Sequence, residues 1–153
     1  IEVGPKGKGP PLHFHKRFTE EFTVLKGQMK VQLGKRIVTL IEGESCKIDK
    51  GMLHTFWSES NEPVRFHGEL EPASKDFENG ITIMFGLAND GLLNSMGIPK
   101  KISHAFVIQE LSDSHVKGLM NLFFSFLAIF INKGKLVKER DSLIERYCKK
   151  LNL

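Results

Sequence analysis

Short stretches of alternating apolar and polar residues, separated by glycine-containing turns, fill residues 12 to 72 of this 153-residue chain. Such alternation puts every second side chain on the same side of a β-strand, so that one side is buried and the other is solvated. Extended segments are predicted at 12–15, 20–25, 28–33, 36–41, 45–48, 53–57 and 64–70. Short strands at this spacing are typical of an antiparallel barrel or sandwich, and this restricts the first half of the chain to that class.

The periodicity changes after Pro72, where apolar residues begin to recur at helical spacing. Ser74 is a suitable N-cap for a first helix. The apolar side of that helix is expected to consist of Phe77, Ile81, Met84, Phe85 and Ala88. Further helices are predicted at 102–108, at 115–131 with residues 112–114 as its cap, and from 136 onward after a break at 133–135. We therefore expect a mainly β fold, with a barrel domain at 1–73 and a helical extension at 74–153 that packs on the barrel or on a partner subunit.

Charge and cysteine content exclude several classes of protein. The net charge of +4 belongs entirely to residues 133–153, which hold seven Lys/Arg and three acidic residues, while the preceding chain is balanced at 15 to 15. A basic nucleic-acid-binding core is therefore excluded, and we expect no nucleic-acid partner. Two cysteines, Cys46 and Cys148, are too few for a disulfide framework and predict a reducing, cytoplasmic location. Residues 1–12 lack the apolar stretch that a signal peptide needs.

Three histidines and one glutamate form the most informative pattern in the chain. His13 and His15 are two residues apart, so on a strand their side chains point to the same side. Glu20 opens the next strand, and His54 opens another after a glycine turn. Three imidazoles and a carboxylate suit one divalent ion of Fe, Mn, Ni, Co or Zn. Four such ligands on an octahedral ion leave two positions for water, O2 or substrate. Glu21 is an alternative ligand, although it would point away from the side that carries Phe22.

These residues resemble the cupin superfamily at both of its sequence motifs, which span 7–27 and 43–58. The first motif is matched by Gly7, His13, His15, Glu20 and Gly27. The second motif is matched by Gly43, Gly51 and His54. Asp49 and Ser58 stand where the family has proline and asparagine, which are positions in a turn and around the ligands. The chain is thus similar to small single-domain bacterial cupins with a C-terminal helical extension.

The resemblance implies a double-stranded β-helix, or jelly-roll barrel, with one metal ion inside. It implies a metal-dependent protein that acts on a small organic molecule by dioxygenase-like, isomerase or lyase chemistry, with Glu20 as a ligand or base. The alternative is a non-catalytic module that binds a metal or a small ligand, or a barrel that has kept its histidines without a functional metal. The walls of the core or pocket are expected to include Phe22, Met29, Phe56 and Trp57. A homodimer is also expected, since small cupin barrels commonly pair.

The last part of the chain, 115–153, combines an apolar segment with a basic amphipathic one. The apolar run at 119–131 spans 13 residues with two polar interruptions and is too short to cross a bilayer alone. An apolar helix beside a Lys/Arg-rich helix suits an interfacial membrane anchor. It also suits a phenylalanine-rich helix that packs on the barrel or on a partner, with a basic helix that stays in solvent. This packing is favoured, because the β region exposes sheet surface that helices can cover. Peripheral membrane contact through 115–153 is therefore one of two alternatives.

Overall fold

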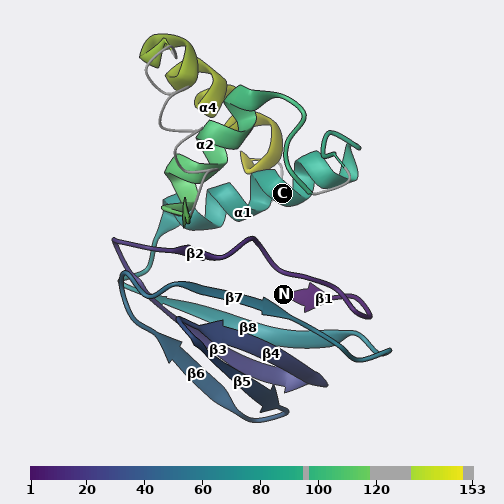
Figure 1. Ribbon diagram of the computed structural model, residues 1–153. Coiled ribbons are helices and arrows are strands. Elements are labelled where there is room, and N and C mark those ends of the chain that lie inside the picture. Colours follow the sequence, from purple (N-terminus) through teal and green to yellow (C-terminus); the bar gives the residue numbers. More distant parts are fainter. Residues whose placement is uncertain (95–96, 118–131, 150–153) are drawn as a thin grey trace. The chain divides into compact units, whose positions relative to one another are not determined.

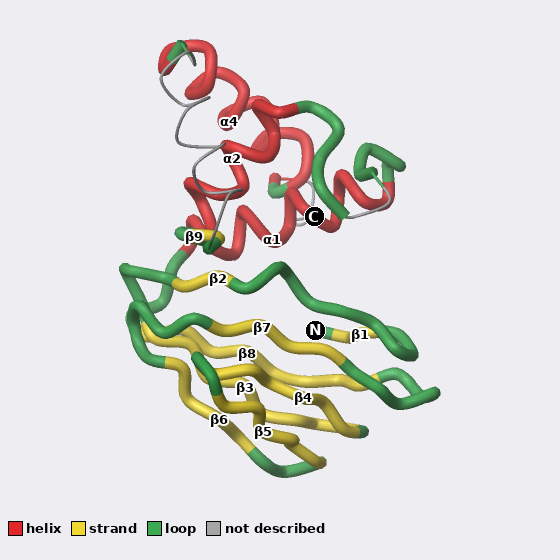
Figure 2. The backbone as a smooth tube through the Cα atoms, in the orientation of Figure 1, coloured by secondary structure: helices red, strands yellow, loops and turns green. Residues whose placement is uncertain are grey.

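The computed structural model describes residues 1–94, 97–117 and 132–149. These residues fall into two compact units, and each unit is described by itself. The first unit consists of Ile1–Ser74 and His115–Lys117. The second consists of Lys75–Ser114 and the described part of Gly118–Leu153. Figure 1 labels the strands of the first unit and the helices of the second, and Figure 2 shows the loops that connect them.

The first unit contains two antiparallel sheets, which confirms the mainly β fold with C-terminal helices that the sequence predicts. Its described strands are β1 (Glu2–Val3), β2 (His13–Phe14), β3 (Thr19–Lys26), β4 (Gln28–Leu33), β5 (Arg36–Ile41), β6 (Ser45–Ile48), β7 (His54–Trp57), β8 (Val64–Glu71) and β9 (His115–Val116). One sheet has the order β1-β8-β3-β6, and the other has the order β5-β4-β7-β2-β9. Strands distant in sequence, such as β2 and β7, thereby become neighbours (Figure 1).

A two-residue turn at Gly34-Lys35 joins β4 to β5. Leu33 pairs with Arg36 on either side of this turn, and the pairing continues to Gln28 and Ile41 at the far end. Gly34 has a φ of 61°, a left-handed conformation that costs glycine little and suits the tight turns of hairpins. The turn therefore sets the register of β5, and with it the side on which each residue of β5 lies.

The core of the first unit is made by side chains from the inner faces of both sheets. Its buried members are Phe22, Val24, Met29, Val31, Leu40, Ile48, Val64 and Phe66. Phe22, Phe56 and Phe66 meet edge to face, with ring centroids 5.1–5.4 Å apart. Such contacts add to the free energy gained from burial of the rings themselves. The alternation predicted from the sequence is therefore what builds this core.

The second unit packs its three described helices around a separate core. These helices are α1 (Lys75–Asn89), α2 (Ile102–Ser112) and α4 (Lys133–Tyr147). Its buried members are Ile83, Leu87, Val107, Ile108, Leu111 and Leu143. On α1 the buried side differs from the predicted one, because Ile83 and Leu87 are buried while Phe85 is 54% exposed. Gly80 explains the difference, since a Cβ placed there would lie 3.2 Å from that of Leu111 and its absence lets α2 approach α1 on this side.

The helix predicted at 115–131 is wrong at its beginning. Asp113 has a left-handed φ of 49° and ends α2, so residues 112–114 are the end of one helix and not the cap of the next. His115 and Val116 form β9, which pairs with β2. Pairing between segments so distant in sequence leaves no local signal, which explains the error. Residues 118–131 lie outside the described ranges.

Two further predictions near the chain ends are corrected. Lys133–Lys135 was expected to break a helix, but α4 begins at Lys133, and the side chain of Asn132 caps it by accepting a hydrogen bond from the Lys135 N–H at 3.1 Å. Glu2 and Val3 form β1, a strand that the sequence did not predict, because they pair with Arg65 and Val64 of β8.

Within the described ranges, no helix combines the length and the apolar character needed to cross a lipid bilayer. The sequence predicted that 115–153 contacts a membrane surface, which does not require a helix that crosses the bilayer. Most of the apolar part of this segment lies in residues 118–131, outside the described ranges. That contact stays a prediction.

Replacement of Phe66 by alanine tests the core of the first unit. Phe66 is fully buried against Phe22 and Phe56, so Phe66→Ala should lower the free energy of unfolding of this unit by about 3–5 kcal/mol. Leu25→Ala, at a position 51% exposed, is the control and should change it by at most about 0.5 kcal/mol. Urea denaturation followed by the fluorescence of Trp57, the one tryptophan of the chain, measures both. Equal losses would contradict the assignment of this core.

Candidate metal centre

His13 and His54 lie directly opposite each other on neighbouring strands. The register of β2 and β7 pairs these two residues, and their ring centroids are 4.2 Å apart. His15 follows two residues after His13, and its ring centroid lies 4.8 Å from that of His13 and 5.2 Å from that of His54. Its backbone carbonyl accepts a hydrogen bond from the Gly51 N–H at 2.7 Å, which ties this segment to the turn before β7. Strand pairing therefore gathers the three imidazoles.

Glu20 approaches the histidines from the other sheet. It lies on β3, where Glu20, Phe22 and Val24 alternate as buried residues with the less buried Glu21 and Thr23. Its Oε2 atom lies 3.1 Å from Nε2 of His54 and 3.7 Å from Nε2 of His15. The candidate centre thus draws its side chains from both sheets.

The geometry of this group fits a single metal ion. The ligand nitrogens of His13, His15 and His54 all lie within 4.8 Å of one another, and Glu20 contacts two of these three residues. Two ligand atoms on one ion, each about 2.1 Å from it and 90–110° apart, are separated by roughly 3.0–3.5 Å. The contacts of Glu20, at 3.1 and 3.7 Å, are close to this separation, and the histidine nitrogens would move toward one another on binding an ion.

Backbone carbonyls select the tautomer of two of the imidazoles. His13 Nδ1 lies 2.8 Å from the carbonyl oxygen of Pro11, and His54 Nδ1 lies 2.9 Å from that of Met52. A carbonyl can only accept, so each Nδ1 carries the hydrogen and donates it. In the neutral ring, Nε2 then holds a lone pair. This is the arrangement in which a protein presents histidine to a metal.

The acceptor atoms of this site lie so close together that they need a positive charge between them. The Nε2 lone pair of His54 faces an oxygen of the Glu20 carboxylate at 3.1 Å, and two acceptors at this distance repel each other unless a proton or a cation lies between them. All four residues are at most 7% exposed, so bulk water does not relieve the repulsion. A divalent cation bound by these atoms would satisfy the lone pairs together.

Burial, reinforced by the adjacent His54 and His15, lowers the pKa of His13 from its ordinary 6.5 to about 3. His13 is therefore neutral near pH 7 and keeps its lone pair. Cys46, which pairs with Phe22 across β3 and β6, behaves differently. Burial, with Glu20 nearby, raises the pKa of this thiol to about 11, so it remains protonated at neutral pH in the metal-free protein.

Phe18 is a member of this site that the sequence did not single out. It is buried at 2% exposure, and its ring centroid lies 4.6 Å from that of His15. It occupies the segment between β2 and β3, where no strand periodicity marks its direction. The carbonyls of Pro11 and Met52 were also missed, because every residue has a carbonyl and the side chain gives no signal for its use.

The four predicted wall residues are placed in different surroundings. Phe22 and Met29 belong to the buried core, and Phe56 packs against it. Trp57 is the next residue on β7 and therefore points to the opposite face of its sheet. Its indole N–H donates to Glu59 at 3.2 Å. Strand alternation thus separates Trp57 from the other three.

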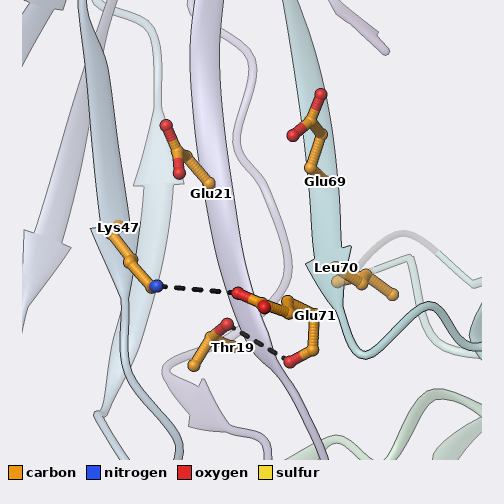
Figure 3. Close-up of a pocket in the computed structure, with 6 residues that line it drawn as sticks. All are labelled: Thr19, Glu21, Lys47, Glu69, Leu70 and Glu71. Atoms are coloured by element: carbon orange, nitrogen blue, oxygen red, sulfur yellow. Dashed lines mark hydrogen bonds and ion pairs between the residues drawn. The ribbon is translucent and has the colours of Figure 1, made fainter.

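Glu21 lines a hollow of about 260 Å³ on the polar face of its sheet, away from the histidines. Figure 3 shows this hollow, with Glu21 from β3, Lys47 from β6, and Glu69 and Glu71 from β8. The ammonium group of Lys47 lies 3.8 Å from the carboxylate of Glu71. A second hollow, of about 200 Å³, is lined by Gln28, Met29, Lys30, Glu59 and Ser60. Neither of these hollows is lined by His13, His15, Glu20 or His54.

Comparison with known proteins gives one family match and several similar folds. Residues 1–70 match the family described as Cupin domain. The crystal structure of TT1209 from Thermus thermophilus is 20% identical over 45% of this chain and 65% of its own, with a TM-score of 0.43. A sugar phosphate isomerase from a cupin superfamily of Silicibacter pomeroyi is 19% identical over 44% of each chain, with a TM-score of 0.42. A predicted oxalate decarboxylase from Thermotoga maritima is 22% identical over 45% of this chain and 59% of its own, with a TM-score of 0.43.

Each alignment therefore spans less than two thirds of the solved structure that it matches. No curated protein matches the chain significantly.

The hydrogen bonds to Pro11 and Met52 predict the protonation of two rings. In the metal-free protein at pH 7, His13 and His54 should carry their hydrogen on Nδ1, because each Nδ1 donates to a carbonyl. Long-range ¹H–¹⁵N correlation spectra of the side chains measure this, and His13→Gln and His54→Gln variants assign the signals. A hydrogen on Nε2 of His13 would contradict the geometry described here.

Proposed function

This chain belongs to the cupin superfamily through its residues 1–70, and we propose that His13, His15 and His54 bind one divalent metal ion, with Glu20 as the fourth donor. The observation that carries the proposal is the buried approach of the Glu20 carboxylate to the Nε2 lone pair of His54 at 3.1 Å. Carbonyl-fixed tautomers on His13 and His54 support it, because both rings offer Nε2 to the same space. A donor set of imidazoles with one carboxylate suits Fe, Mn, Ni, Co or Zn.

Two functions are compatible with such a centre, and a specific observation bears on each. The first is a metal-dependent reaction of a small organic molecule, of the oxygenase, isomerase or lyase class. A bound metal would supply Lewis acidity there. Glu20 favours this function, since a buried carboxylate beside two imidazoles can accept a proton from a substrate.

The second function is a non-catalytic module that binds a metal or a small ligand. It is supported by the burial of His54, which is only 1% exposed. A ligand screen on the metal-loaded full chain by thermal shift, followed by oxygen-consumption and product assays on each stabilising compound, distinguishes the two. Ligand binding without turnover would favour the module.

Removal of one imidazole tests the metal centre. The wild-type chain should bind one Co²⁺ or Zn²⁺ per chain, and His54→Ala should weaken that binding by at least about 100-fold because it removes a donor inside the cluster. His67→Ala is the matched control, since His67 lies exposed on β8 beside Glu69. Elemental analysis gives the stoichiometry, and the absorbance of bound Co²⁺ gives the affinity. Stoichiometric metal with unchanged affinity in His54→Ala would refute the proposal.

The neighbouring glutamates on β3 provide an internal comparison. Glu20→Gln removes a negative charge beside the imidazoles and should weaken Co²⁺ binding by roughly 10–100-fold. Glu21→Gln makes the same chemical change on the opposite face of the strand, where Glu21 lines the outer hollow, and it should leave the affinity unchanged. Both variants are measured by the same Co²⁺ titration. Equal affinities in the two variants would exclude Glu20 from the centre.

A further inference from the structure

Strand β9 brings a segment that is distant in sequence to the candidate metal centre. It is the outer strand of the larger sheet, beside β2, which carries His13 (Figure 2). β9 consists of His115 and Val116, whereas the family match ends at residue 70. In the chain, only Asp113 and Ser114 stand between the end of α2 and β9. The sheet that carries His13 is therefore completed by residues from outside the family match.

The pairing of β2 with β9 is more extensive than its pairing with β7. β2 is two residues long, and its register with β7 pairs His13 with His54. Its register with β9 pairs both of its residues, His13 with Val116 and Phe14 with His115. A strand this short makes few backbone hydrogen bonds, so its position depends on the strands at both of its sides.

Backbone hydrogen bonds of this segment alternate between β9 and β7. The Lys117 N–H donates to the Leu12 carbonyl at 3.2 Å, so Leu12 faces β9 with its backbone. The His15 carbonyl accepts from a backbone N–H of the turn before β7 at 2.7 Å, so it faces the other side. Direction repeats every second residue in an antiparallel pair, so Phe14 also faces β9 and His13 faces β7. Without β9, the residues directly before and after His13 would lose these backbone hydrogen bonds.

Side chains support the same pairing on both faces of the sheet. On one face, the ring of His115 stacks on that of Phe14, with centroids 5.2 Å apart and an interplanar angle of 27°. On the other face, Val116 lies directly opposite His13, so its side chain is on the side that carries His13 and His54. A valine at this position offers no ligand atom of its own. β9 thus flanks the donor set without adding to it.

We propose that β9 is a positioning element of the metal centre, which holds β2 so that His13 stays opposite His54. This role rests on the metal site proposed above. Because β2 must be in place to present His13 to an ion, the pairing of β9 with β2 is coupled to the affinity for the ion. Such coupling is reciprocal, so binding of the ion strengthens β9 pairing by the factor by which loss of that pairing weakens binding.

A backbone variant of the full chain tests this role. Lys117→Pro removes the N–H that donates to Leu12 and should weaken Co²⁺ binding about tenfold. Proline restricts the preceding residue to extended conformations, which Val116 already has in β9. Lys117→Ala is the matched control, because it removes the same exposed side chain but keeps the N–H, and it should leave the affinity unchanged. Absorbance of bound Co²⁺ measures the affinities, and circular dichroism verifies the fold of each variant.

Hydrogen exchange of the wild-type chain tests the coupling without any substitution. One equivalent of Zn²⁺, which is diamagnetic, should slow exchange of the Lys117 N–H about tenfold, because the ion holds β2 and β2 holds β9. The Gly43 N–H is the control, since it donates to the Val24 carbonyl, four residues along β3 from Glu20. Its exchange rate should not change. NMR spectra recorded after transfer into deuterated water measure both rates.

The position of His13 also has a readout in the metal-free chain. Its Nδ1 donates to the Pro11 carbonyl in the segment that leads into β2, so loss of β9 pairing should disturb this hydrogen bond. The side-chain ¹H–¹⁵N signals of His13 should therefore shift in Lys117→Pro and stay unchanged in Lys117→Ala. The signals of His67, which is exposed on β8, should be the same in all three chains.

The results that would overturn the role of β9 differ from those that would refute the metal site. Equal Co²⁺ affinity in Lys117→Pro and the wild type, with one ion bound per chain, would exclude β9 as a positioning element. Exchange of the Lys117 N–H that does not respond to Zn²⁺ would exclude it as well. A wild-type chain that binds no Co²⁺ would refute the metal site instead. Unchanged His13 signals in metal-free Lys117→Pro would then exclude positioning by β9.

Discussion

The burial of three imidazoles and one carboxylate within the first unit is the constraint that the candidate centre depends on. Groups of this kind lose hydration when they leave water, and the loss is large unless partners replace the solvent. The structure supplies two of these partners as backbone carbonyls, which take the Nδ1 hydrogens of His13 and His54. What remains is a set of acceptor atoms from both sheets that converge on one another. The pairing of β2 with β7 and the inward face of β3 both serve to hold this convergence.

Much of this centre could be predicted from the sequence, because its spacing is local. His13 and His15 share a side through strand alternation, and the bounds of β4, β5 and β6 agree with the predicted segments at 28–33, 36–41 and 45–48. The same alternation distinguishes Glu20 from Glu21. Phe18 could not be predicted in the same way, since it lies between strands, and neither could the roles of the Pro11 and Met52 carbonyls. Local periodicity reports which side a residue faces, but not which backbone atom it will meet.

In the helical part of the chain, contacts between residues distant in sequence decide more than the local pattern does. The existence of α1 and its beginning after Ser74 follow from capping and periodicity, whereas its buried side depends on the approach of α2 at Gly80. A glycine counts as neither apolar nor polar in a pattern. The apolar side predicted for α1, which included Phe85 and Ala88, therefore did not include Gly80. Likewise β9 exists because β2 lies beside it. Elements that owe their position to a distant neighbour are the ones that the sequence alone misplaces.

The two carbonyls that orient His13 and His54 have a consequence for how this site tolerates change. Each carbonyl precedes its histidine by two residues, and every amino acid at position 11 or 52 would carry the same acceptor. The orientation of both rings therefore depends on the backbone conformation of these segments and not on which side chains stand at positions 11 and 52. The side chain at either position can therefore be replaced without rotating the imidazoles, provided that the backbone conformation is kept. Insertion or deletion of a single residue in either segment would alter the path of the chain, so the length of these two short approaches is what fixes the orientation of the rings.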